Sequence, residues 1–230
     1  MKLTWLGHGG FRIEIEDQAL LLDPWLSGNP VFPEESRDAA TKDATHILLT
    51  HGHGDHTGDA LALSRETGAP LVGIYDLMGH WEATEGVATV GFNKGGTVHL
   101  GRVAVSMVAA THSSSLGSDA GPVYAGAEAG YIIRGEGHCI YVSGDTDIMA
   151  DMAWIGEYHA PDIGILCAGG HFTMDMKGAA WAAKRYFNFK TVIPCHYKTF
   201  PILAQTADEL VAGLPGVDVR TPNVMETLEI

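Results

Sequence analysis

Short runs of apolar residues recur along the chain and predict a series of β-strands. The runs are rich in β-branched residues and too short for helices, which favours strands. They cover residues 3–6, 11–15, 19–22, 46–49, 71–74, 103–108, 131–133, 139–142, 163–166 and 191–194. Segments with the apolar spacing of helices lie between the later runs, at residues 58–66, 148–158, 176–187 and 207–214. The first third is typical of hairpins and the remainder alternates strand with helix, so the pattern predicts a layered α/β fold of sheets covered by helices.

One polar segment interrupts this pattern, at residues 24–43, where Pro30 and Pro33 precede a charged stretch. It is too polar for a core element and longer than a plain connection, and such loops are often functional covers. We therefore expect it to shape the substrate pocket. No linker, repeat or low-complexity block divides the sequence, and its 230 residues, 46 % of them hydrophobic, can bury one sizeable core. We expect a single domain over residues 1–230.

Composition limits the classes of partner. The chain has 28 acidic and 14 basic residues, a net charge of −14, which repels polyanions and argues against nucleic-acid binding. The first twenty residues lack the apolar run of a signal peptide or membrane span, so we expect no membrane partner and a cytoplasmic protein. Three cysteines without a Cys-x-x-Cys pair indicate reduced, buried thiols. The oligomeric state stays open, a homo-oligomer included.

The candidate chemistry is concentrated in a run that follows the predicted strand 46–49. It reads Thr50-His51-Gly52-His53-Gly54-Asp55-His56, with three imidazoles and a carboxylate at a strand-to-helix turn. Alternate residues of an extended segment point the same way, so the first two histidines can bind one ion. Asp55 and His56, at the start of the following helix, can bind a second. Imidazole and carboxylate groups at this spacing are typical ligands of zinc-like ions.

Three more polar groups follow predicted strands. His112 comes after the run 103–110, Asp145 after 139–142, and His196 after 191–194. Taken singly, each histidine could be a polar residue at the rim of a sheet, and Asp145 could cap a helix that begins near Asp147. Taken together, they place candidate metal ligands at one edge of the sheets.

These elements, in this order, resemble the metallo-β-lactamase-fold hydrolase superfamily. Within it the chain is most similar to small metal-dependent hydrolases related to the lactonase that opens ascorbate 6-phosphate. The residues that carry this likeness are 4–8, 170–174 and 193–200. The resemblance implies a four-layer αββα sandwich, of α/β (α+β) class, with two divalent metal ions at one edge.

The resemblance also implies a ligand set. One metal would be held by His51, His53 and His112 and the other by Asp55, His56 and His196, with Asp145 bridging the two. The di-iron, oxygen-reducing branch of the fold places a glutamate at the position of His53. An imidazole there favours Zn²⁺ and hydrolysis, while Mn²⁺, Ni²⁺ and Fe remain open.

The expected reaction is hydrolysis by a hydroxide that bridges the two metals. Its target would be an ester, lactone or phosphoester of a small molecule, anionic or carbonyl-bearing because the metal pair is cationic. Asp55 is a candidate catalytic residue as well as a ligand. His8 and His171, each beside glycines, are candidate substrate contacts or proton donors, although a surface histidine at a turn fits His8 equally well. Asp175 is more consistent with a helix cap, and Tyr197 and Lys198 flank a ligand.

Three alternatives are weaker. A true β-lactamase would carry a longer flap where residues 7–10 form a tight turn. A nucleic-acid or cyclic-nucleotide phosphodiesterase would use the same metal core, but the net charge argues against a polyanionic substrate. A non-catalytic metal-binding protein would be expected to lack one of the ligands, and none is missing.

Overall fold

The first of two large sheets is built from both ends of the chain. The computed structural model describes residues 1–230. This sheet has seven strands in the order β16-β1-β2-β3-β4-β5-β6, antiparallel up to β3 and parallel from β3 to β6. Its strands are β1 (Lys2–Gly7), β2 (Gly10–Ile15), β3 (Gln18–Leu22), β4 (His46–Leu48), β5 (Leu71–Ile74), β6 (Thr89–Phe92) and β16 (Thr227–Glu229). The predicted hairpins at the N-terminus are confirmed.

The second large sheet also has seven strands, in the order β15-β14-β13-β12-β11-β8-β7. Its strands are β7 (Thr97–Leu100), β8 (Val103–Ala109), β11 (Ala129–Gly135), β12 (His138–Val142), β13 (Ile163–Cys167), β14 (Thr191–Cys195) and β15 (Asp218–Val219). The half from β12 to β15 is parallel, and β13 and β14 are buried along their whole length, as strands covered on both faces should be. A separate hairpin pairs β9 (Ser115–Leu116) with β10 (Val123–Tyr124).

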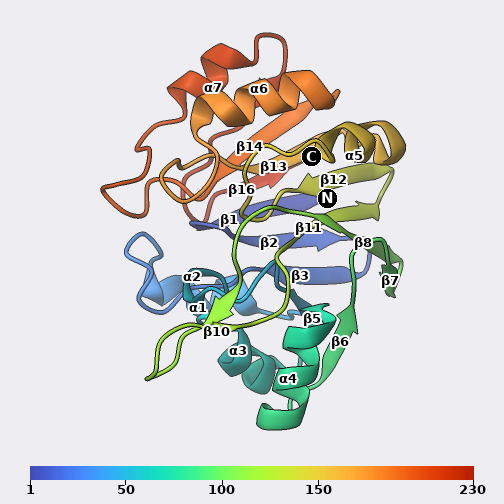
Figure 1. Ribbon diagram of the computed structural model, residues 1–230, viewed down its shortest axis with the longest axis vertical. Coiled ribbons are helices and arrows are strands. Elements are labelled where there is room, and N and C mark those ends of the chain that lie inside the picture. The colour runs from blue at the N-terminus through green and yellow to red at the C-terminus, as the bar shows by residue number, and fades with distance from the viewer.

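Helices lie at both ends of the stacked sheets (Figure 1). Beside the first sheet are α3 (Ala60–Thr67) and α4 (Tyr75–Glu85), and beside the second are α5 (Met152–His159), α6 (Met176–Tyr186) and α7 (Asp208–Gly213). Shorter helices are η1 (Glu34–Ser36), α1 (Arg37–Thr41) and α2 (Gly54–Thr57). This arrangement confirms the predicted αββα layering. None of the helices is both long and apolar enough to cross a membrane.

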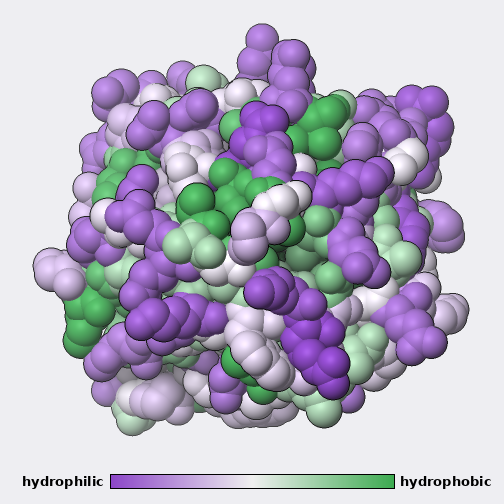
Figure 2. All heavy atoms as spheres, turned by 90° about the horizontal axis from the view of Figure 1, so that it is seen from above, coloured by the Kyte–Doolittle hydropathy of each residue, from purple (hydrophilic) through white to green (hydrophobic).

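The core consists of 63 buried residues that reach from Leu3 to Leu228. Trp5 and Trp81 belong to it, whereas Trp154 and Trp181 are exposed on α5 and α6. The surface at the α6–α7 end is mainly hydrophilic, with separate hydrophobic patches (Figure 2).

The main error in the predicted elements concerns α4, which the sequence pattern does not indicate. This helix has no side-chain cap at its start and carries Gly79 in its interior, and both features weaken a helical signal. The helix expected at 148–158 begins only at Met152, and the one expected at 58–66 is preceded by the separate short helix α2.

Candidate metal centre

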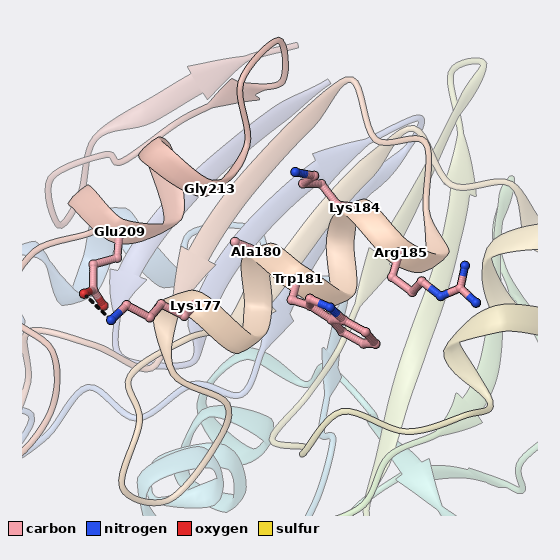
Figure 3. A pocket seen from close by; sticks show the side chains of 7 residues that line it. All are labelled: Lys177, Ala180, Trp181, Lys184, Arg185, Glu209 and Gly213. Carbon is pink, nitrogen blue, oxygen red and sulfur yellow. Dashed lines mark ion pairs between the residues drawn. The ribbon is translucent and has the colours of Figure 1, made fainter.

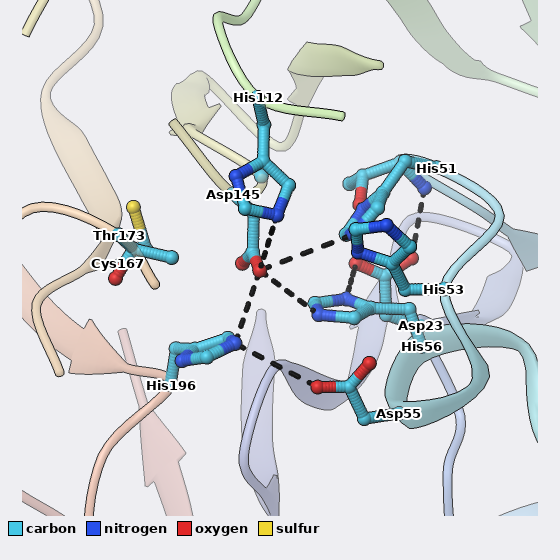
Figure 4. Close-up of polar contacts among 12 residues, drawn as sticks. Asp23, His51, His53, Asp55, His56, His112, Asp145, Cys167, Thr173 and His196 are labelled. Atoms are coloured by element: carbon cyan, nitrogen blue, oxygen red, sulfur yellow. Dashed lines mark hydrogen bonds and ion pairs between the residues drawn. The ribbon is translucent and has the colours of Figure 1, made fainter. Parts of the chain in front are cut away.

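The carboxyl ends of strands from both sheets meet at one place and bring the predicted ligands together. The run Thr50–His56 leads from β4 into α2, while three more ligands follow strands of the second sheet. The centre of the cluster is Asp145 (Figure 4). Its Oδ2 atom lies 3.0 Å from Nε2 of His196, 3.3 Å from that of His56, 3.6 Å from that of His112 and 3.9 Å from that of His51.

The donor atoms form three overlapping groups, and within each group they lie within 4.8 Å of one another. The groups are His51, His53 and His112; His8, Asp55, His56 and His196; and His51, His56 and Asp145. The structure therefore assembles all seven predicted ligands and adds His8 beside the second set. No helix begins near Asp145, so the capping alternative for this residue is wrong.

The charges of these groups suit cation binding. Burial lowers the pKa of His51 well below its usual value, and burial also lowers the pKa of His53 and His112, so their lone pairs are available at neutral pH. Burial alone would raise the pKa of Asp145, but the adjacent imidazoles of His56 and His196 lower it well below its usual range. The carboxylate therefore stays ionised in the middle of the cluster.

His56 shows most directly that the residues present fit a cation. Its Nε2 atom is buried, faces Asp145 and has no hydrogen-bond partner. Burial alone would lower the pKa of this imidazole, but Asp145 and Asp23 raise it well above its usual value. The surroundings of Nε2 thus favour a positive charge, and a bound metal ion would supply one.

Asp23, which the sequence analysis missed, orients two members of the site. It follows β3, and its Oδ2 accepts hydrogen bonds from Nδ1 of His56 at 2.9 Å and from the Thr50 hydroxyl at 2.7 Å. The Thr50 hydroxyl in turn accepts from Nδ1 of His51 at 3.0 Å. Both imidazoles therefore direct Nε2 towards Asp145, the arrangement that carboxylate partners impose on metal-binding histidines. The position after the predicted strand 19–22 was the only signal for Asp23.

The loop that carries His53 is fixed from the second sheet. Ser113 Oγ lies 3.3 Å from Nε2 of His53, which leaves Nδ1 facing His51 Nε2 at 3.0 Å. The backbone N–H of Gly52 donates to Ser114 Oγ at 3.1 Å. A Cβ atom at Gly52 would lie 2.6 Å from that of Ala125, so only glycine allows this close approach.

His8 lies in the two-residue turn between β1 and β2, where it is fully buried. Its Nε2 lies 2.9 Å from Asp55 Oδ2, its Nδ1 lies 2.8 Å from the Thr199 hydroxyl, and its carbonyl accepts the backbone N–H of His196 at 2.8 Å. Burial lowers the pKa of His8 to about 4. The neutral ring therefore donates from Nε2 to Asp55 and does not line the open cavity. The tight turn confirms that no long flap is present.

A cavity of about 600 Å³ opens onto the cluster. It is lined by His53, Gly54, Asp55, His112, Ser113, Ser115, Gly117, Ser118, Gly121, Pro122, Asp145, Phe172 and His196. His171 is not part of this wall: it is exposed, with φ +57°, and its ring contacts that of Phe172. The wall at this loop is formed by the neighbouring Phe172, and a contact of His171 with a substrate stays a prediction.

The segment 24–43 contributes no residue to the cavity wall, so the prediction that it shapes the pocket is wrong. It approaches the site through Trp25, whose ring contacts that of His8 edge to face. Asp59 ties the segment down, because its carboxylate accepts the backbone N–H groups of Leu26 and Ser27 and pairs with Arg37 at 2.7 Å. These contacts hold the segment in place and include none of the predicted metal ligands.

Two other predicted residues have structural contacts. Asp175 caps α6 by accepting the N–H of Gly178 at 2.7 Å, as expected. The Lys198 ammonium lies 5.1 Å from the ring centroid of Tyr197 and 5.9 Å from that of Trp5. It is therefore placed over these rings and not in the cavity wall.

A second hollow, of about 490 Å³, lies on α6 and α7 (Figure 3). Its wall includes Lys177, Trp181, Lys184 and Arg185, and Lys177 pairs with Glu209 at 3.1 Å. It contains none of the histidines or carboxylates of the metal centre.

The chain is similar to several known proteins. The family described as "Beta-lactamase superfamily domain" matches residues 18–197. A protein of Dinoroseobacter shibae named "UPF0173 metal-dependent hydrolase" is 71 % identical over 230 residues, all of both chains. One of the same name from Paracoccus denitrificans is 69 % identical over the same span. The solved structure of Igni18, described as a novel metallo hydrolase from Ignicoccus hospitalis, is 33 % identical with a TM-score of 0.86 and covers 100 % of this chain and 98 % of its own.

Proposed function

The chain belongs to the beta-lactamase superfamily and is a metal-dependent hydrolase, and from this premise we propose that it cleaves an ester or lactone bond of a small molecule at a centre of two divalent cations. The observation that carries the proposal is the position of Asp145 Oδ2, 3.0–3.9 Å from Nε2 of four imidazoles. A single carboxylate in that position can serve two cations at once.

The donor set divides into two sites. His51, His53 and His112 would hold one cation, and Asp55, His56 and His196 the other, with Asp145 shared. Imidazole nitrogen and carboxylate oxygen are preferred ligands of Zn²⁺, which makes zinc our proposed metal, although Mn²⁺, Ni²⁺ and Fe accept the same donors. The surroundings of His56 support this assignment, because its Nε2 atom is buried beside Asp145 and forms no hydrogen bond.

When bound, the cations would polarise the reacting carbonyl and lower the pKa of water to near neutrality. The chain's own residues orient the ligands and handle the proton. Asp55 lines the cavity, and its Oδ2 accepts a hydrogen bond from His8 while Oδ1 has no hydrogen bond within the protein. We propose that Asp55 Oδ1 accepts a proton from water in the cavity. His8 acts through Asp55 and is a positioning residue.

The proposal also covers domain organisation and location. Ligands come from both large sheets, which supports one functional domain over residues 1–230. Cys139, Cys167 and Cys195 are all free thiols, which supports a reducing, cytoplasmic environment.

Metal content and activity together test the proposed function. Elemental analysis of the loaded protein should find about two divalent ions per chain, and a panel of lactones and esters should include substrates. Asp145→Asn should lower kcat/KM by about 100-fold or more, because loss of the shared charge weakens both sites. Asp175→Asn is the control: asparagine also caps helices, so its activity should equal that of the wild type. Absence of stoichiometric metal after loading, or full activity of Asp145→Asn, would contradict the proposal.

A further inference from the structure

The wall of the cavity provides hydroxyl groups and one aromatic ring but no cationic side chain. Without the proposed ligands, the lining residues are Gly54, Ser113, Ser115, Gly117, Ser118, Gly121, Pro122 and Phe172. Most of them come from the region around the β9–β10 hairpin, whereas Phe172 comes from the loop between β13 and α6. No lysine or arginine is among them. Any positive charge in this cavity would therefore come from the proposed metal centre.

At the hairpin tip, the backbone amides of Ser118, Ala120 and Gly121 all donate to acceptors within the tip. The N–H of Ser118 and that of Gly121 each donate to the other's carbonyl, at 3.1 and 3.0 Å. The N–H of Ala120 donates to the Ser118 hydroxyl at 3.2 Å, and that hydroxyl donates to the Gly121 carbonyl at 2.6 Å. The tip also carries Asp119, which is exposed and acidic. An anion here would find these donors occupied and a negative charge nearby.

Basic side chains elsewhere are engaged by other parts of the fold. Lys198 lies over Tyr197 and Trp5, and Arg37 pairs with Asp59. The basic residues of α6 line the separate hollow of Figure 3. A substrate phosphate on the outer wall, remote from the metals, would therefore gain no ion pair there and would lie near the hairpin tip that carries Asp119.

The remaining wall groups suit a neutral, oxygen-rich molecule. The Ser115 hydroxyl has no hydrogen bond within the protein, and Ser113, which can accept from His53, keeps its own proton to donate. Both can bind hydroxyl or carbonyl oxygens. The Phe172 ring, about half exposed, offers an apolar face for the carbon skeleton.

We infer that the substrate is a hydroxylated ester or lactone with no charge remote from the reacting bond, and that phosphorylated counterparts are rejected. This inference rests on the proposed hydrolysis and specifies its substrate class. Ser113, Ser115 and Phe172 are then the specificity-determining residues. Each acts on the part of the substrate that lies away from the metals.

A matched pair of substrates tests the inference: a hydroxylated γ-lactone and the same lactone phosphorylated on that hydroxyl. With the metal-loaded enzyme, kcat/KM for the neutral lactone should be at least about tenfold higher, the equivalent of one unpaired polar contact. In calorimetric titrations, which involve no turnover, the ring-opened product of the neutral lactone should bind more tightly than that of the phosphorylated lactone. Equal or higher kcat/KM for the phosphorylated lactone would overturn the inference and leave the proposed hydrolysis intact. Failure of the loaded enzyme on both lactones, with the product order retained, would overturn only the proposed reaction.

A charge-introducing variant provides the converse test. Ser118→Lys places an ammonium on the wall and should raise kcat/KM for the phosphorylated lactone about tenfold. Ser118→Gln, of similar length but neutral, is the matched control and should show no such gain. If both variants raise kcat/KM for the phosphorylated lactone equally, the lack of a positive charge on the wall is not the reason that this substrate is rejected. The inference would then be wrong.

Discussion

His8, Asp23 and His196 show how much of the metal centre depends on single residues in unusual backbone conformations. All three have positive φ angles, of 53°, 43° and 59°. Residues other than glycine adopt such angles at a cost of order 1–3 kcal/mol and keep them where surrounding contacts require them. Here those contacts are hydrogen bonds within the site: His8 bonds to Asp55 and His196, and Asp23 to His56 and Thr50.

The positioning role of His8 leads to a prediction about metal affinity. His8→Ala removes the donor to Asp55 and should weaken the proposed metal site that includes Asp55 by about 10–100-fold, the usual effect of losing such a partner. His8→Gln can still donate from its amide and should retain most of the affinity. Competition with a chromophoric chelator measures both.

His80→Ala is the control for these variants, since this histidine is exposed on α4. Unchanged affinity of both metal sites in His8→Ala would show that Asp55 does not need this partner.

At the scale of elements, the end of β13 must approach the end of β14 closely to place His196. Gly169 makes this possible, because a Cβ atom there would lie 1.8 Å from the His196 carbonyl oxygen. The neighbouring bond from the N–H of Ala168 to the Cys195 carbonyl, at 3.0 Å, holds the two strand ends together. The position of the ligand is therefore determined by backbone contact between adjacent parallel strands.

Gly169→Ala should separate these strand ends. We expect a loss of about 1–3 kcal/mol in the free energy of unfolding, as for other overpacked sites, and less than two bound metals per chain. Urea denaturation and elemental analysis measure the two effects. Gly79→Ala in α4 is the matched control: no atom lies within 4 Å of its added Cβ, so the variant should be as stable as the wild type or up to about 1 kcal/mol more stable. Full metal content in Gly169→Ala would refute this account of the strand ends.

On the scale of the whole molecule, the metal centre lies where the two seven-stranded sheets meet. His51, His53, Asp55 and His56 follow the first sheet, while His112, Asp145 and His196 follow the second. Bound cations would cross-link the two halves of the fold. The core of 63 residues also extends through both halves, so we expect the metal-free protein to remain folded but to be less stable.

Removal of metal should therefore lower the Tm. Binding at about 100 times Kd contributes about 2.7 kcal/mol, and each kcal/mol corresponds to about 2–4 °C for a chain of this size, so chelation should lower the Tm by about 5–10 °C. Thermal unfolding followed by circular dichroism, with and without a chelator, measures the shift. Chelation should lower the Tm of Asp145→Asn much less, because the substitution has already weakened metal binding. An equal shift in both proteins would argue against metal at this centre.

The sequence by itself determined the features that depend on neighbours along the chain. The alternation of apolar runs with helical spacing predicted the layered fold, and the spacing from His51 to His56 predicted a metal site. Asp175 was recognised as a cap because it stands directly before a helical pattern. Such signals survive in sequence because the interactions that produce them span only a few residues.

Only the tertiary structure decided which distant residues act on the same site. Asp23 lies 27 positions before Thr50 in sequence and hydrogen-bonds to it, and His8 lies 47 positions before Asp55. Phe172 lines the cavity while His171, its neighbour in sequence and in ring contact with it, does not. These choices depend on how two sheets and their loops pack, and no local pattern records a contact between residues that meet only when the whole chain has folded.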